Sequence, residues 1–237
     1  MIPHASETPD GALADFLARA AAGLSREPPG PDDPTSNPRG DHSFEPDGRA
    51  AIPPPPHRRA AVLVPVVARS NGLFVVLTQR AGHLRDHSGQ VALPGGKIEP
   101  HDVTPLAAAL REAEEEIGLD PECVRMLGYL DPYLSATGFL VVPVIGLIDS
   151  EAVLAPSPAE VDAIFEVPLT VLMDPARYHL RSREWQGRAR RFYAVPYGDR
   201  LIWGVTAGIL HNLRDRLLSA APESRDAAAY AGCEPLS

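Results

Sequence analysis

The chain has 237 residues, of which 44% are apolar and 22% charged, a balance typical of folded globular proteins rather than disordered or fibrous ones. Its formal net charge is −9, from 31 acidic and 22 lysine and arginine side chains, which argues against general electrostatic binding to nucleic acid. Two cysteines cannot form a disulfide framework, and no apolar run reaches the ~20 residues of a membrane-spanning helix, so we expect a cytoplasmic protein without a nucleic acid or membrane partner.

The N-terminal part is expected to be an extension that only tethers. Residues 10–24 place apolar side chains at helical spacing behind Asp10, a suitable N-cap, and so predict a short amphipathic helix. Residues 25–56 hold ten prolines and few apolar side chains, which predicts a disordered linker because too little surface can be buried to offset chain ordering. The predicted division is an extension over 1–57, a folded domain over 58–220 and a tail over 221–237.

From residue 60 onward the pattern changes to strands and helices. Residues 60–69 and 73–80 flank an Asn-Gly pair and predict a β-hairpin, and a second hairpin is expected over 178–198 about a Gln-Gly pair. Because strands and helices are mixed without regular alternation, we predict an α/β sandwich with helices packed on a mixed sheet. The remaining predicted elements are strands over 124–130 and 139–148 and helices over 104–118 and 201–218.

Three glutamates on the helix predicted over 104–118 suggest a cation site. Glu112, Glu115 and Glu116 stand at positions i, i+3 and i+4 and therefore share one helix face. Like charges so placed destabilise a helix by roughly a few tenths of a kcal/mol per pair, which suggests that a cation lies among them. Clustered carboxylates suit Mg²⁺ or Mn²⁺, with water and substrate phosphates completing the shell. The alternative is a solvated acidic surface partnered by Arg111.

Glycines flank this acidic helix on both sides. Gly95 and Gly96 precede it in a Pro-Gly-Gly loop, where glycine lets the backbone turn tightly and approach a ligand. Gly118 follows it as a C-terminal cap. A glycine loop, an acidic helix and a cap in succession indicate a binding site, and we call residues 94–119 the glycine–glutamate segment.

The glycine–glutamate segment resembles the Nudix box, G-x5-E-x7-R-E-U-x-E-E-x-G-U, in which U is a bulky apolar residue. Asp102 stands where the first glutamate is expected and is separated from Arg111 by eight residues instead of seven, and Ala113 fills the first U position. The resemblance implies a Nudix-type α/β/α sandwich. The matching residues are Gly96, Arg111, Glu112, Glu115, Glu116, Gly118 and Leu119.

Residues upstream of this segment resemble the coenzyme A pyrophosphatase branch of the Nudix superfamily, in which L-T-x-R precedes L-x-x-H-x-G-Q-V. Residues 158–169 and 202–210 also look like that branch, so the resemblance covers roughly 60–218. The matching upstream residues are Leu77, Thr78, Arg80, Leu84, His87, Gly89, Gln90 and Val91.

This resemblance implies that Mg²⁺ or Mn²⁺ supports hydrolysis of coenzyme A or an acyl derivative to 3′,5′-ADP and 4′-phosphopantetheine or its acylated form. Glu112 and Glu116 are the expected principal metal ligands, with Glu115 supporting them. Arg111 is expected to orient a glutamate by a charged hydrogen bond. The proton of the attacking water is expected to pass to Glu115, Glu116 or Glu160, because relatives sometimes use a glutamate on a later loop.

Coenzyme A also carries a 3′-phosphate, so its binding requires further cations. Arg80, Arg85 and His87 precede the glycine loop and are expected to bind substrate together with the backbone of Gly95 and Gly96. Arginine can contact phosphate oxygens through two parallel hydrogen bonds, and Arg80 at a strand end is the strongest candidate. An ordinary surface charge at Arg85 and a packed loop histidine at His87 are the alternatives.

Two other functions are consistent with the same residues. One is hydrolysis of another diphosphate such as ADP-ribose, because the box determines the chemistry but not the groups that flank the diphosphate. The other is a non-catalytic module that binds coenzyme A. The three intact glutamates argue against the second, since binding alone does not require mutually repelling carboxylates.

Overall fold

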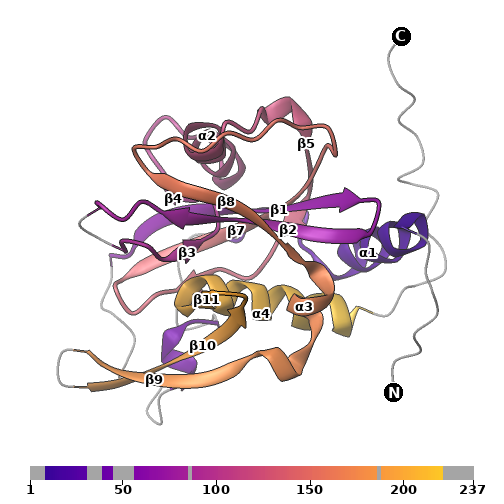
Figure 1. Cartoon of the computed structure of the whole chain (residues 1–237). Helices are drawn as coiled ribbons and strands as arrows, with labels where there is room; N and C mark the ends of the chain where they lie inside the picture. The colour runs from indigo at the N-terminus through magenta and orange to yellow at the C-terminus, as the bar shows by residue number, and fades with distance from the viewer. Residues whose placement is uncertain (1–8, 31–38, 45–55, 85–86, 186–187, 221–237) are drawn as a thin grey trace.

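The computed structural model describes residues 9–30, 39–44, 56–84, 87–185 and 188–220. Figure 1 shows a helix above a large sheet, with a long helix and a smaller sheet below it. Within these ranges every helix is too short or too polar to cross a lipid bilayer. The elements in chain order are α1 (Pro9–Gly23), η1 (Asp41–Phe44), β1 (Arg58–Arg69), β2 (Gly72–Arg80), β3 (Val91–Ala92), β4 (Gly95–Lys97), α2 (Pro105–Ile117), η2 (Pro121–Cys123), β5 (Val124–Tyr129), β6 (Tyr133–Leu134), β7 (Phe139–Ile148), β8 (Val161–Pro168), α3 (Leu169–Met173), η3 (Pro175–Arg177), β9 (His179–Trp185), β10 (Arg188–Tyr197), β11 (Arg200–Trp203) and α4 (Gly204–Ser219).

The large sheet is mixed, as predicted. Its main path runs β3-β2-β1-β7-β5, with β4 beside β1, β6 beside β7 and β8 beside β2. β1 and β7 are parallel, whereas β1 and β2 form the predicted antiparallel hairpin, closed at the Arg69–Gly72 pair. β9 and β10 form the second predicted hairpin and join β11 in a separate three-stranded sheet.

β1 contributes side chains to two apolar cores because successive residues of a strand point to opposite faces. Ala61, Leu63 and Val67 pack on the α2 side, whereas Val64 and Val66 pack on the side of α1 and α4. Helices therefore cover both faces of the sheet, which confirms the predicted sandwich. The helix residues buried in these cores include Ala108, Ala109, Ala113 and Ile117 of α2, and Leu210, Leu213 and Leu217 of α4.

Local signals set the ends of α2 where the sequence predicts them. The Thr104 hydroxyl accepts a hydrogen bond from the Ala107 N–H at 3.1 Å, and Pro105 occupies the first turn. Gly118 adopts a left-handed φ of 64°, and its N–H donates to the Glu114 carbonyl at 2.9 Å. Both ends of α2 are thus capped, and its buried residues pack against the sheet.

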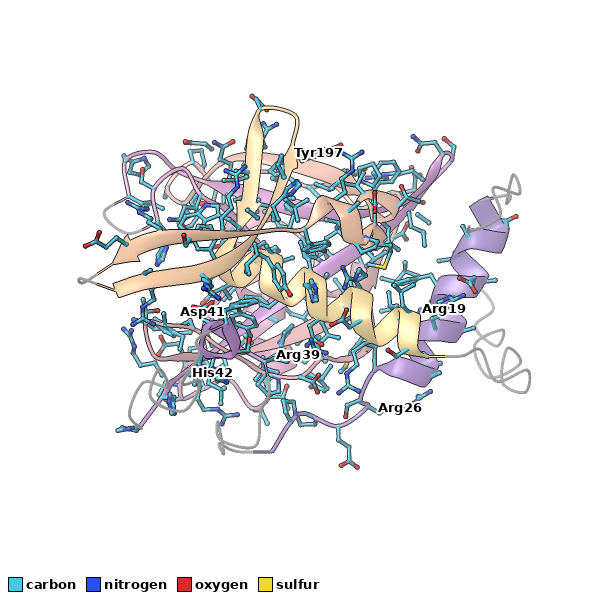
Figure 2. The ribbon with its side chains drawn as sticks, turned by 90° about the horizontal axis from the view of Figure 1, so that it is seen from below. Arg19, Arg26, Arg39, Asp41, His42 and Tyr197 are labelled. Carbon is cyan, nitrogen blue, oxygen red and sulfur yellow. The ribbon has the colours of Figure 1, made fainter. Side chains whose placement is uncertain are left out.

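α1 packs against α4, so the expectation that the extension only tethers is wrong for this helix. Phe16 and Ala20 are buried in the same core as α4. A Cβ at Gly23 would lie 2.7 Å from the Arg216 carbonyl oxygen, which shows how closely the two helices approach. The Arg19 guanidinium donates to the Leu217 carbonyl at 3.3 Å, and Figure 2 shows Arg19 beside the end of α4.

The prediction of a disordered linker over 25–56 is wrong for two stretches. Ser25 forms a two-way backbone bridge with Tyr129, at 3.0 and 2.7 Å. In residues 39–44 the Asp41 carboxylate accepts hydrogen bonds from the Tyr133 hydroxyl at 2.8 Å and the Ala136 N–H at 2.7 Å. Hydrogen bonds therefore order these two stretches. The prediction of disorder considered only the burial of apolar side chains and did not include such bonds. The other parts of the extension predicted to be disordered (1–8, 31–38 and 45–55) and the tail over 221–237 lie outside the described residues, and the domain boundaries stay predictions.

The helix predicted over 201–218 begins three residues later than expected. Arg200–Trp203 form β11, where Ile202 pairs with Val195 of β10 and is fully buried. α4 then starts at Gly204, whose φ is 63°. Strand pairing with β10 therefore overrides the helical periodicity of these residues.

Candidate active site

β4 brings the glycine loop against two glutamates of α2. The Gly95 N–H donates to Oε2 of Glu116 at 3.2 Å. A Cβ at Gly96 would collide with the carboxylate of Glu112, and one at Gly95 would collide with the Ala61 carbonyl in the adjacent strand. Both predicted glycines are thus required, because Gly96 leaves room for the Glu112 carboxylate and Gly95 leaves room for the neighbouring strand β1.

Glu116 is a buried carboxylate in an acidic environment. Its side chain is only 4% exposed, and burial raises its pKa to about 7. This value is the net result of burial, of the Gly95 N–H and the Arg80 guanidinium, which lower the pKa, and of the Glu160 and Glu112 charges, which raise it. Nη1 of Arg80 lies 3.5 Å from Oε1 of Glu116. A further cation at this point would therefore favour the ionised form of Glu116.

Arg111 positions the acidic side chains around it. Its Nε and Nη2 donate to the two oxygens of Asp102 at 3.2 and 3.0 Å, and Nη2 also donates to the Lys97 carbonyl. Nη1 donates to Glu112 at 2.9 Å and Glu115 at 3.3 Å. Hydrogen bonding to Arg111 lowers the pKa of the buried Asp102 carboxyl. The shorter acid at position 102 thus still forms a two-point ion pair with Arg111.

The structure brings Glu160 to the site and leaves Glu115 at its edge. The Glu160 carbonyl accepts the Ala81 N–H at 2.8 Å, and the Glu116 carbonyl accepts the Ser157 N–H at 2.9 Å, so the 155–160 loop joins β2 to α2. The Glu160 charge raises the pKa of Glu116, as given above. The Glu115 side chain is 55% exposed and turns toward Arg111.

The donor set fits a hard divalent cation only in part. Among the described residues, no three carboxylate, imidazole or thiol side chains have the arrangement of a protein-only metal site. Burial raises the pKa of Glu112, to which the charges of Glu115 and Glu160 add, so these carboxylates repel one another. Mg²⁺ usually keeps several waters and takes one or two carboxylates plus substrate phosphates. Glu112 and Glu116, the two carboxylates beside the glycine loop, meet that requirement.

A cavity of about 450 Å³ opens beside the two glycines, a size suited to a small molecule. Strands of the large sheet form one wall, and β10, β11 and the first turn of α4 form the other. Its apolar lining includes Val91, Phe139, Val141, Phe192, Trp203 and Ile209. Its charged lining consists, among the described residues, of Arg80, Arg183, Arg190, Arg191 and Asp41.

The expected substrate-binding residues lie around this cavity, except for one outside the described residues. Arg80 lines it, and its buried Nε has no hydrogen-bond partner within the described part of the chain. Gly95 and Gly96 border it, as does His87, an exposed residue with φ of 59° whose Nδ1 lies 2.9 Å from Oε1 of Gln90. Arg85 lies outside the described residues.

Comparison with known proteins decides the family. A model of the NUDIX domain matches residues 56–188, more than half of the chain. The chain belongs to the Nudix family.

Its curated relatives include two proteins named "Uncharacterized Nudix hydrolase NudL". The one from Escherichia coli O7:K1 is 45% identical over 158 residues, 66% of this chain and 81% of the relative. The one from Photorhabdus laumondii is 42% identical over 172 residues, 70% and 91% of the respective chains. Among solved structures, a Nudix hydrolase from M. smegmatis, RenU, is 24% identical, with a TM-score of 0.42 over 48% of this chain and 72% of that one.

Sequence reasoning missed four charged residues that line the cavity of this Nudix family member. Arg183, Arg190 and Arg191 come from the β9–β10 hairpin, whose arginine-rich sequence on both sides of the turn was a usable signal. Asp41 comes from the proline-rich extension, where nothing in the sequence sets it apart. Figure 2 shows Asp41 and His42 on the short helix η1, beside the hairpin and α4.

Proposed function

We propose that this Nudix hydrolase cleaves the diphosphate of coenzyme A or an acyl derivative in the cytoplasm, giving 3′,5′-ADP and 4′-phosphopantetheine or its acylated form. One observation carries the proposal. The residues that resemble the coenzyme A branch, among them Arg80, His87 and Gln90, line the same cavity that reaches Gly95 and Gly96. A diphosphate beside the glutamates can therefore extend its organic group into an apolar, arginine-containing chamber.

Nudix hydrolases generally use divalent metals such as Mg²⁺ or Mn²⁺, and the carboxylates here suit either ion. We assign Glu112 and Glu116 as the principal ligands of the divalent ion, with Glu115 as a supporting ligand. When bound, such an ion neutralises charge on the diphosphate and lowers the pKa of water. Arg111 holds Glu112 and Glu115 in place through Nη1, and Arg80, which lines the cavity, neutralises a phosphate.

Glu160 is the proposed general base. It is half-buried, it lies on a loop rather than on α2, and its charge affects both Glu112 and Glu116. In the proposed step a water oxygen attacks one phosphorus, its proton passes to the Glu160 carboxylate, and the bond to the bridging oxygen breaks. The leaving phosphate then carries that oxygen, and the base returns its proton to solvent or product.

Product identification tests this function. Purified full-length protein is incubated with coenzyme A, acetyl coenzyme A, ADP-ribose and a dinucleoside polyphosphate, each with Mg²⁺ or Mn²⁺, and the products are identified by mass spectrometry. We expect 3′,5′-ADP and phosphopantetheine from coenzyme A at the highest kcat/KM. A higher kcat/KM for ADP-ribose would overturn the substrate assignment, and tight coenzyme A binding without products under either metal would indicate a binding module.

A further inference from the structure

A second group of cations, from the β9–β10 hairpin, lines the cavity. Figure 1 shows this hairpin on the opposite side of the large sheet from α2. Arg183 of β9 and Arg190 of β10 are directly opposite each other in the hairpin register, and Arg191 follows. Like charges directly opposite on neighbouring strands destabilise a sheet. An anion between them would remove this repulsion.

The described residues provide little countercharge for Arg183 and Arg191. Arg190 faces the buried Asp41 carboxylate, which already accepts hydrogen bonds from Tyr133 and Ala136. Arg183 and Arg191 are exposed, and neither forms an ion pair with a carboxylate in the described part of the chain. In a chain of net charge −9, this wall of the cavity is therefore locally cationic.

The first turn of α4 and two aromatic rings complete this end of the cavity. Gly204 and Val205 line it, and no described side chain caps the start of α4, so its free N–H groups add positive potential. The rings of Phe192 and Trp203 lie 5.1 Å apart between their centroids and also line the cavity. A flat base could contact these rings while a phosphate on its sugar meets the arginines.

We propose that Arg183, Arg190 and Arg191 bind a second anionic group of the substrate, a phosphate monoester on its nucleoside half. The inference rests on the proposed function, since the 3′-phosphate of coenzyme A is such a group. The diphosphate lies at Arg80 and the glutamates, and the nucleoside occupies the aromatic chamber between the two cationic regions. The preferred substrate class is therefore a nucleoside diphosphate derivative with an additional phosphate, rather than ADP-ribose.

The test compares coenzyme A with 3′-dephospho-coenzyme A, which lacks only that phosphate. We expect the full-length wild type to favour coenzyme A in kcat/KM by at least about tenfold, the scale of one charged hydrogen-bonded contact. Arg183→Gln combined with Arg191→Gln should lower the ratio severalfold toward one, mainly by raising KM for coenzyme A. Arg190 stays unchanged because it faces Asp41.

Matched variants make the comparison specific. Arg181→Gln removes an exposed arginine of the same strand that is outside the cavity lining, and it should keep the wild-type ratio. Lysine at 183 and 191 keeps the charge and should restore part of the preference. The same ratio is measured for each single glutamine variant, so that the test still has a result if the double variant does not fold.

The outcomes separate this inference from the proposed function. Cleavage of coenzyme A with a wild-type ratio near one, or with the same ratio in the glutamine variants, overturns the anion site and leaves the function standing. If neither compound is cleaved, the function fails, and calorimetry with 3′,5′-ADP and 5′-AMP tests the site alone. Tighter binding of 3′,5′-ADP that is lost in the glutamine variants supports it, and equal wild-type affinities overturn it.

Discussion

Arg111 and Asp102 form a two-point ion pair, with Nε to Oδ1 at 3.2 Å and Nη2 to Oδ2 at 3.0 Å. The remaining amine, Nη1, donates to Glu112 and Glu115. One guanidinium thus links the loop before α2 to two glutamates on it. Its planar geometry determines where Glu112 lies, although Arg111 is outside the cavity lining.

Arg111→Lys is therefore expected to weaken metal binding. An ammonium group cannot form the parallel bonds to Asp102 and still reach Glu112. Loss of a residue that orients metal ligands typically costs about 10- to 100-fold in metal affinity or activity. Titration of Mg²⁺ against turnover measures the effect, with KM for substrate expected to change little. An unchanged Mg²⁺ requirement would remove Arg111 from this role.

Glu116→Gln is expected to lower kcat by orders of magnitude without unfolding the protein. The amide loses the negative charge that a divalent ion requires, whereas burial at this position already disfavours charge, so the neutral side chain remains compatible with the fold. Turnover is measured at saturating Mg²⁺, and folding by circular dichroism. Near-normal rates under these conditions would contradict the assignment of Glu116.

Gly95 and Gly96 should respond differently to alanine. At Gly96 the new methyl would displace the Glu112 carboxylate, the mobile end of a side chain, so we expect kcat to fall at least about tenfold with little change in melting temperature. At Gly95 it would meet the Ala61 carbonyl, and φ is 153°, so the main expected effect is lost stability. Melting curves and turnover of both variants provide the comparison, and equal melting temperatures for the two would refute it.

Asp41→Ala should destabilise the protein although Asp41 lies in the extension. The substitution leaves the Tyr133 hydroxyl and the Ala136 N–H without their acceptor, at a cost of about 1–3 kcal/mol in unfolding free energy. Urea unfolding of D41A, Y133F and the double variant measures it. The two single losses should not add, because both remove the same hydrogen bond. Additive losses would mean that the two side chains do not interact.

His211 should make stability fall in mild acid. Burial lowers the pKa of its imidazole from 6.5, and Nε2 accepts from Arg214 at 3.1 Å, which requires the neutral ring. The unfolded chain gains its proton as the pH falls through 6.5, whereas the folded ring gains it only at lower pH, so stability is lost over that interval. His211→Phe keeps the stacking on Tyr193 and should reduce the drop between pH 7.5 and 5.5 in urea unfolding. The same drop in both proteins would exclude this origin.

Local chemistry explains which parts could be predicted from the sequence. The ends of α2 follow from Thr104 and Gly118, and the β1–β2 hairpin from an Asn-Gly turn between alternating apolar residues. The glutamates of α2 share a face because of helix geometry alone. These elements need no information from distant residues.

The rest depended on contacts between distant segments. Ile202 lies in a strand only because Val195 is available to pair with it. Asp41 is ordered by Tyr133, a partner 92 residues away along the chain. Arg183 and Arg190 were identified as hairpin residues, but only the packing of the small sheet against α4 turns them toward a cavity. Residue type and spacing do not contain this information.

In the proposed function, the large sheet separates the residues that cleave the bond from those that select the substrate. Figure 1 shows α2 on one side of the sheet and the β9–β10 hairpin on the other, and Gly95 and Gly96 of β4 both contact the glutamates of α2 and line the cavity. Substitutions in the hairpin can thus alter which molecule is accepted while the hydrolytic apparatus stays intact. Proteins that share this acidic helix could therefore acquire different substrate specificities through changes in the β9–β11 sheet alone.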